Sequence, residues 1–185
     1  MKNKLRFIII ASGILFSHLS SAQDSLYVSK NLNISFFSKT SVEDIDATSH
    51  KGVSAISLKN KDVFFRVPLV SFEFRNKLME EHFNENYVES DKYPNASFRG
   101  RITSMTPIAG QPGAFDVKVT GKLNLHNVEK EYTVSGILKT DKSQISIQCK
   151  FTILIKDHNI EIPSVLSMNV AEKVEANISG SYQLK

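Results

Sequence analysis

The segment ISIQCKFTILI (residues 145–155) alternates between apolar and polar side chains over most of its length. Every odd position from Ile145 to Ile155 is apolar, whereas positions 146, 148, 150 and 152 carry Ser, Gln, Lys and Thr. A period of two is typical of a β-strand with one face on the core and one face in water. Sheets with one wet face are commonly antiparallel, because parallel sheets are covered on both faces. The segment therefore predicts an antiparallel all-β protein.

The same period of two continues through the second half of the chain. From Phe115 to His126 the odd positions are apolar or glycine and the even positions are polar, and the alternation returns in Tyr132–Leu138 and Val174–Leu184. Weaker candidate strands in the first half are Leu26–Ser29, Ile34–Lys39, Val42–Thr48, Val53–Leu58, Val63–Val67 and Ala96–Thr103. We expect hairpin turns at Asn60-Lys61 and Asn127–Lys130. The pattern indicates about eight strands with short connections.

A short helix is expected at Lys77–Asn84, where Met79 and Phe83 lie one turn apart and Asn76 can cap the first turn. The segment is brief, and residues 80–82 are all polar. It is therefore interpreted as a lid or plug near the mouth of a barrel, and not as part of a helical layer.

Strands of this number and length fit either an up-and-down barrel or a sandwich. Gly100, Gly121, Gly136 and Gly180 all fall on the predicted inward faces of their strands. Glycine weakens a strand, so its use there favours bends of a closing barrel or space kept for something inside. Tight packing of a solid core beneath these glycines is the alternative. We favour the barrel.

Residues 1–22 have the composition of a signal peptide. Lys2, Lys4 and Arg6 precede an apolar run from Phe7 to Phe16, and residues 20–22 read Ser-Ser-Ala. We expect cleavage after Ala22, a single domain over residues 23–185, and a periplasmic or secreted protein. The apolar run is shorter than the roughly 20 residues that span a bilayer, so no transmembrane anchor is expected.

The charge of the chain argues against a nucleic-acid partner. The formal net charge is +4, from 23 basic and 19 acidic residues. Three of those basic residues belong to the leader, and none of the acidic ones does. The remainder is close to neutral, which is not the composition of a nucleic-acid-binding domain.

Catalytic and metal-binding patterns are absent from the sequence. His50, His82, His126 and His158 do not have the close spacing of metal ligands. His126 falls on an outward position beside a turn, where a solvated imidazole is expected. His82 follows Glu81, which could form a carboxylate–imidazole pair, but a solvated helix face is the preferred interpretation. We expect no enzyme, no metal and no cofactor.

The single cysteine and two apolar segments complete the pattern. Cys149 lies on an inward face and is expected to be a buried, inert thiol. One apolar group surrounds the expected helix: Phe64, Phe65, Phe72, Phe74, Leu78, Met79, Phe83 and Tyr87. A second group comprises Ile160, Ile162, Val165, Leu166, Met168 and Val170. Both could line a tunnel for a long apolar ligand, or plug the barrel, and the pattern alone does not choose.

Several stretches resemble the YceI-like family, particularly its versions from the Bacteroidetes. FEFRNKLMEEHFNENY (72–87) and KYPNASFRG (92–100) are similar to the family's short helix and the Tyr-Pro-x-Ala-x-Phe-x-Gly strand start that follows it. VTGKLNLHNVEK (119–130) resembles the family's Gly-x-Leu-Thr-Ile-His-Gly-Val-Thr-Lys signature, with Asn127 in place of Gly. IEIP (160–163) is also similar. The matching positions are Leu78, His82, Phe83, Tyr87, Tyr93, Pro94, Phe98, Gly100, Gly121, Leu123 and His126.

The resemblance implies an exported, lipocalin-like antiparallel β-barrel that binds a polyisoprenoid or related long-chain lipid in its central cavity, without catalytic residues or metal. In that arrangement the helix and its neighbours cover the cavity, while Phe98 and Leu123 line it. The residues expected to line or cover the cavity are Phe72, Phe74, Leu78, Met79, Phe83, Tyr87, Phe98, Val119, Leu123, Phe151, Ile153 and Ile178.

Two other functions remain open at this point. A secreted barrel with a filled interior could act through its surface on another protein, in a structural or stress-related role. An enzyme in which His82 and Glu81 act on a bound lipid is the third possibility.

Overall fold

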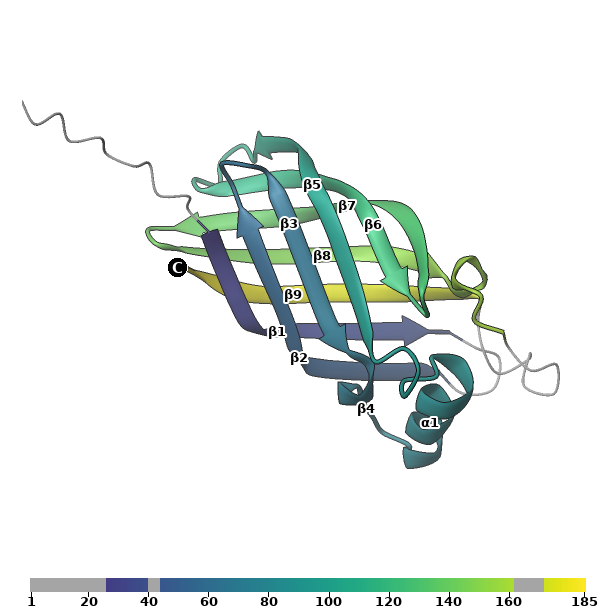
Figure 1. The fold of residues 1–185 in the computed structure, drawn as a ribbon. Helices are drawn as coiled ribbons and strands as arrows, with labels where there is room; N and C mark the ends of the chain where they lie inside the picture. The colour runs from purple at the N-terminus through teal and green to yellow at the C-terminus, as the bar shows by residue number, and fades with distance from the viewer. Residues whose placement is uncertain (1–25, 40–43, 162–171) are drawn as a thin grey trace, which may run out of the picture.

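The computed structural model describes residues 26–39, 44–161 and 172–185, most of which lie in strands (Figure 1). The strands are β1 (Leu26–Ser38), β2 (Ile45–Ser57), β3 (Asp62–Pro68), β4 (Glu73–Phe74), β5 (Asn95–Pro107), β6 (Ala114–Leu125), β7 (Val128–Asp141), β8 (Gln144–Leu154) and β9 (Lys173–Leu184). The helical segments are η1 (Leu69–Ser71), α1 (Lys77–His82), η2 (Phe83–Tyr87) and η3 (Ile155–His158). No helix within these ranges is long and apolar enough to cross a membrane.

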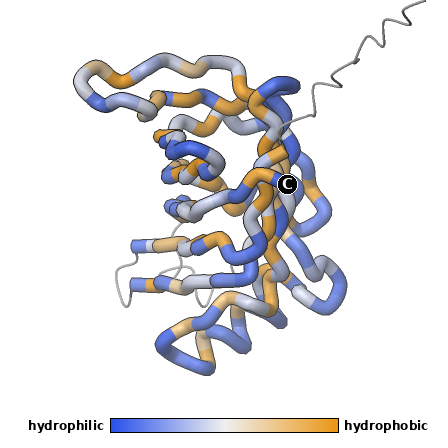
Figure 2. Tube along the Cα trace, turned by 90° about the vertical axis from the view of Figure 1, so that its left-hand side faces the viewer, coloured by the Kyte–Doolittle hydropathy of each residue, from blue (hydrophilic) through white to orange (hydrophobic). Residues whose placement is uncertain are grey.

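The strands close into an antiparallel barrel. Hydrogen-bonded neighbours follow the order β1-β9-β8-β7-β6-β5-β3-β2, and β2 pairs with β1 to complete the circle. β4 adds two residues to the edge of β2. Apolar and polar residues alternate along the strands (Figure 2). The prediction of an all-β barrel of about eight strands with one short helix is confirmed.

β1 and β2 are each one long strand, so the prediction of two short strands in each region was wrong. The polar residues Lys30 and Asn31 are both exposed, and the pairing of β1 with β2 shifts register between Ser29 and Leu32. An irregularity of this kind bends a strand without ending it. Both strands bend sharply at this level (Figure 1). The polar interruption in the sequence marks a corner of the barrel.

Other element boundaries also differ from the predictions. β5 is longer than predicted and extends from Asn95 to Pro107. β8 ends at Leu154, and Ile155 begins η3. α1 ends at His82 and continues into η2. The predicted cap is confirmed, because Oδ1 of Asn76 accepts a hydrogen bond from the Leu78 amide at 3.0 Å. Val42 lies outside the described residues.

The turn between β6 and β7 is tighter than predicted. It contains only His126 and Asn127, because β7 begins at Val128. Both turn residues have positive φ angles, 51° and 58°. Two successive positive angles are the geometry of a two-residue hairpin turn that matches the twist of its strands. Asparagine adopts this conformation more readily than other non-glycine residues.

This geometry predicts opposite effects for two substitutions of Asn127. Asn127→Gly is expected to change the free energy of unfolding by less than about 0.5 kcal/mol, because glycine also tolerates positive φ. Asn127→Val is expected to lower it by about 1–2 kcal/mol, since a β-branched residue is strained there. Urea unfolding of the two variants measures the difference. Equal midpoints would contradict the assignment of the turn.

One stretch of the barrel wall lacks strand pairing. β7 and β8 pair only where Gly136–Asp141 faces Gln144–Cys149. Beyond that point Val128–Ser135 and Lys150–Leu154 do not pair with each other, and we call this stretch the seam. The rings of Tyr132 and Phe151, with centroids 5.9 Å apart, lie across it. Side chains therefore close the wall there in place of a backbone ladder.

Candidate ligand-binding cavity

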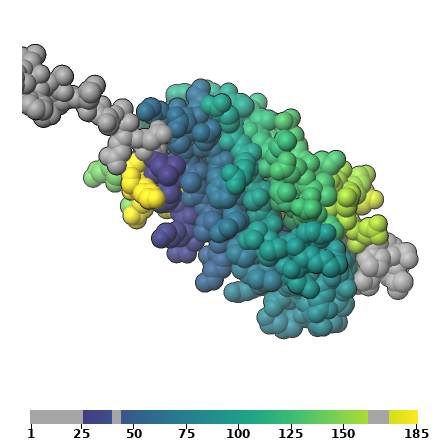
Figure 3. Space-filling model, in the orientation of Figure 1, coloured from purple at the N-terminus to yellow at the C-terminus, as the bar shows by residue number. Residues whose placement is uncertain are grey.

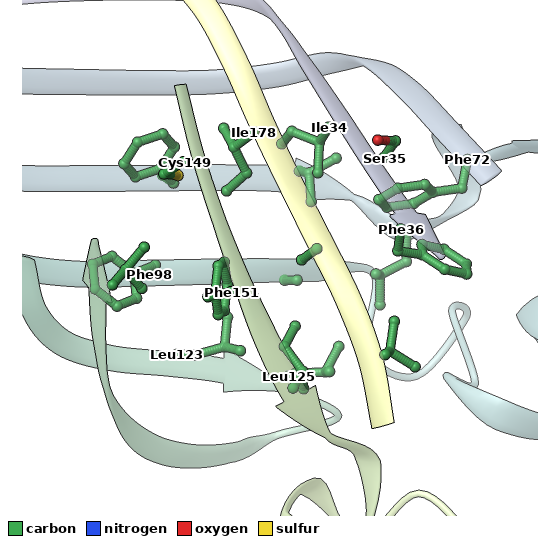
Figure 4. A pocket seen from close by; sticks show the side chains of 18 of the residues that line it. Ile34, Ser35, Phe36, Phe72, Phe98, Leu123, Leu125, Cys149, Phe151 and Ile178 are labelled. Atoms are coloured by element: carbon green, nitrogen blue, oxygen red, sulfur yellow. The ribbon is translucent and has the colours of Figure 1, made fainter. Parts of the chain in front are cut away.

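A cavity of about 450 Å³ lies inside the barrel. This volume falls within the range of roughly 300–1,000 Å³ that is usual for small-molecule sites. All eight barrel strands contribute to its wall, and α1 and η2 contribute further side chains. Figure 4 shows side chains from several strands, among them Ile34, Phe36, Leu123 and Phe151, around this space. The barrel interior is therefore not completely filled.

The twelve residues that were expected to line or cover the cavity all lie along its lining. The segment between β3 and β5 provides Phe72, Phe74, Leu78, Met79, Phe83 and Tyr87. The barrel strands provide Phe98, Val119, Leu123, Phe151, Ile153 and Ile178. That these side chains contact a ligand stays a prediction.

The cavity reaches the surface beside α1. Leu78 lines the cavity and is also 57% exposed. Figure 3 shows α1 and η2, in teal, as a lobe at the lower right of the barrel. We call this end of the cavity the mouth. Met79 and Phe83 pack on the core from this lobe.

Four phenylalanine rings pack together beside the mouth. Phe36 of β1 has its ring centroid 5.2 Å from that of Phe72 and 5.4 Å from that of Phe83. Phe74 lies 5.1 Å from Phe83 and 5.7 Å from Phe36. Tilted and edge-on ring pairs at these distances are favourable beyond their buried area. This aromatic cluster fixes η2 and β4 against the barrel and forms one wall of the cavity.

The sequence missed part of the lining and misplaced one member. Ile34, Phe36, Ile147 and Cys149 also line the cavity, and their alternation within strands was the signal that could have found them. Phe65, a member of the first apolar group, lines the cavity as well. Phe64 was wrongly grouped with the lining residues. It points outward, where the guanidinium carbon of Arg99 lies 4.9 Å from its ring centroid.

The second apolar group can be located only at its first member. Ile160 is buried and lines the cavity. Ile162, Val165, Leu166, Met168 and Val170 lie outside the described residues.

The lining of the cavity carries almost no charge. Among the described lining residues, Arg66 is the only one with a permanent charge, and its side chain is exposed between the inward-facing Phe65 and Val67. Burial raises the pKa of the Cys149 thiol to about 11, so the thiol stays protonated at neutral pH. The cavity therefore suits an uncharged, apolar chain.

A cluster of polar side chains joins three segments near the mouth. Nε2 of His126 lies 2.9 Å from Oε2 of Glu89, and Nδ1 lies 3.1 Å from the carbonyl oxygen of His158. Lys92 forms an ion pair with Glu89 on the other side. Lys92 and then His126 lower the pKa of Glu89, since both stabilise its carboxylate. We call Glu89, His126, Tyr132 and His158 the histidine cluster.

The prediction of a solvated imidazole at His126 was wrong. Its side chain is only 12% exposed, and the ring of Tyr93 lies edge-on 4.5 Å from it. The positive φ of His126 takes this residue out of the strand alternation, and alternation was the basis of the prediction. The imidazole thus lies under the segment that follows η2.

His158 is completely buried at the centre of this cluster. Its Nδ1 lies 3.0 Å from the Val128 carbonyl oxygen, which can only accept, so Nδ1 donates. Nε2 of the neutral ring then accepts from the Tyr132 hydroxyl at 3.1 Å. Burial raises the pKa of Tyr132, which keeps that hydroxyl protonated. The cluster fastens η3 to the start of β7.

Within the ranges that the structure describes, no group of three or more His, Cys, Asp or Glu side chains could hold a metal ion.

The burial of His158 predicts a pH dependence of stability. Burial lowers its pKa below the unfolded value of about 6.5, so the unfolded chain binds more protons in the window between the two values. The free energy of unfolding should therefore fall as pH drops below about 6.5, by about 1.4 kcal/mol for each unit between the folded and unfolded pKa. Denaturation at several pH values measures this slope.

Two variants isolate the contribution of His158. The slope below pH 6.5 should be weaker in His158→Gln, whereas the exposed His50→Gln should keep the wild-type slope. Tyr132 and Asp157, which face or neighbour His158, stay in place in both variants. An unchanged slope in His158→Gln would show that other groups set the pH dependence.

One family model and several solved structures are similar to this chain. The YceI-like domain profile matches residues 17–182. A polyisoprenoid binding domain from Saccharophagus degradans, implicated in plant cell wall breakdown, is 16% identical with a TM-score of 0.70, over 87% of this chain and 99% of that one. BcnA from Burkholderia cenocepacia is 17% identical with a TM-score of 0.66, over 81% of this chain and 95% of that one.

The third similar structure is a YCEI protein from Campylobacter jejuni. It is 15% identical with a TM-score of 0.61, over 80% of this chain and 89% of that one. None of the functionally curated proteins matches the chain in sequence. At these identities the solved structures establish a shared fold.

Proposed function

Because the chain belongs to the YceI-like family, we propose that it is an exported, non-catalytic protein that holds a polyisoprenoid or another long-chain lipid in its barrel cavity. The observation that carries the proposal is the 450 Å³ cavity with its apolar lining. The Saccharophagus degradans domain of the same fold is described as polyisoprenoid binding, which supports this choice of ligand class.

Burial of the lipid chain would supply the affinity. Each methylene group removed from water contributes about 0.8 kcal/mol, so a ten-carbon stretch contributes roughly 8 kcal/mol before the costs of association. Among the described lining residues only the exposed Arg66 carries a permanent charge, so a charged or strongly polar head group would stay at the mouth. The protein would thus recognise the chain of the lipid more than its head group.

Export is part of the proposal. The composition of residues 1–22 supports a cleaved signal peptide, which would place the mature protein in the periplasm or outside the cell. N-terminal sequencing of the protein from its own host tests this. A mature chain that begins at Gln23 is expected, and an intact Met1 would contradict export by this route.

The test of function is native mass spectrometry of the protein purified from its host, followed by extraction and identification of bound lipids. We expect a bound species that is released only on unfolding, with the mass of a long-chain lipid. A ligand-free mass, together with no uptake of added prenols, would overturn the proposal and favour a barrel that acts through its surface. The cavity itself disfavours the filled-barrel alternative.

A further inference from the structure

Along three neighbouring strands the lining of the cavity stops before the end that lies away from the mouth. Along β9 the inward residues Val174, Ala176 and Ile178 line it, but Tyr182 does not. Along β8 the lining runs from Ile153 to Ile147, and Ile145 lies beyond it. Along β1 it includes Phe36 and Ile34 but not Leu32. We call Leu32, Ile145 and Tyr182 the floor.

The floor is solid. Leu32 and Tyr182 are 0% exposed and Ile145 is 2% exposed, and all three belong to one packed core. Ile145 and Tyr182 are directly paired across β8 and β9. The three side chains therefore fill the interior beside β1, β8 and β9, on the side of the cavity away from the mouth.

Two glycines allow Leu32 to take this place. A Cβ atom on Gly180 would lie 2.5 Å from Cδ2 of Leu32, and one on Gly52 would lie 3.0 Å from its Cβ. Leu32 therefore occupies the space that side chains at these two positions would need. The bend of β1 comes directly before Leu32 and brings it to this corner of the barrel. The glycine at position 180 serves tight packing here, and not an open interior.

We propose that this floor sets the length of lipid chain that the cavity accepts, an inference that rests on the proposed function. A methylene group occupies a volume close to that of a water molecule, about 30 Å³, so 450 Å³ holds a chain of about fifteen carbons. Three isoprene units fill this space. The remainder of a longer polyprenyl chain extends through the mouth into solvent, where it adds no affinity.

Binding of linear prenols to the wild-type protein tests the length limit. Geraniol, farnesol and geranylgeraniol contain two, three and four isoprene units, and displacement of a fluorescent apolar dye reports their dissociation constants. We expect at least about tenfold tighter binding from geraniol to farnesol. Between farnesol and geranylgeraniol the affinity should agree within about twofold. A further gain of tenfold or more at geranylgeraniol would overturn the inference.

Variants of the floor test which residues set the limit. Leu32→Ala opens the floor, so geranylgeraniol should then bind about tenfold more tightly than farnesol. Leu32→Met conserves the volume and should keep the wild-type profile. Leu184→Ala removes the same atoms from an exposed leucine near the same end of the barrel and should also keep it. Circular dichroism establishes that each variant is folded before binding is compared.

A second floor variant covers the case in which Leu32→Ala does not fold. Tyr182→Leu also creates space beside Ile145, and it should shift the preference in the same direction if Leu32→Ala does not fold. A folded floor variant that keeps the wild-type length profile would overturn the role of these residues. Failure of every prenol to bind the wild-type protein would instead overturn the proposed function, so the two failures are distinguishable.

Discussion

Phe151→Asp is expected to weaken the binding of prenols at least about a hundredfold and to leave the barrel folded. Phe151 lies on the cavity wall, where a bound chain would cover it. In the empty cavity, water would hydrate the ionised carboxylate that replaces the ring. A bound apolar chain would displace this water without offering the carboxylate a hydrogen-bond partner. A loss of about 2.8 kcal/mol in binding corresponds to the hundredfold effect.

The adjacent position supplies the matched control. Thr152 lies on the outward face of the same strand and is exposed. Thr152→Asp adds the same charge to β8 but should change prenol affinity by less than about twofold. Dye displacement measures binding, and circular dichroism verifies the fold of both variants. Prenol binding retained by a folded Phe151→Asp would show that the ligand does not occupy this part of the cavity.

The second large effect is on stability, at the aromatic cluster. Phe72→Ala is expected to lower the free energy of unfolding by about 3–5 kcal/mol, because Phe72 is nearly buried and its removal leaves a cavity. The substitution also deprives Phe36 and Phe83 of a ring partner. Urea unfolding gives the free energy and the slope with denaturant.

Phe37 is the control for that substitution. It follows Phe36 in β1 but is 38% exposed, so Phe37→Ala should cost much less than Phe72→Ala. The slope with urea should stay the same in both variants, because the unfolded chain exposes a similar area. A loss below about 1 kcal/mol for Phe72→Ala would mean that the cluster relaxes around the gap.

Strand alternation was the part of the fold that the sequence revealed most directly. Inward and outward faces in β6, β8 and β9 could be assigned because every second residue lies on the same side of a strand. In β1 and β2 the same rule misled, because residues at a bend break the period while the backbone ladder continues. Lys30 and Asn31 thus looked like a loop although they lie within a strand.

The candidate cavity was only partly accessible to this reasoning. Ile153 and Ile145 occupy equivalent inward positions on β8, yet one lines the cavity and the other closes it. What separates them is the packing of Leu32 from another strand, which depends on closure of the whole barrel. The histidine cluster was missed for a related reason. Glu89, His126 and His158 lie far apart in the sequence, and only the barrel brings them together.

The seam has a consequence for how the barrel fluctuates. Where neighbouring strands are paired, separating them breaks backbone hydrogen bonds. Between Val128–Ser135 and Lys150–Leu154 no such hydrogen bonds have to break, because the strands are not paired there and the rings of Tyr132 and Phe151 meet across the gap. Amide groups that face the seam should therefore exchange their hydrogens for deuterium faster than those of the paired strands. We therefore expect local opening of the barrel to begin at the seam.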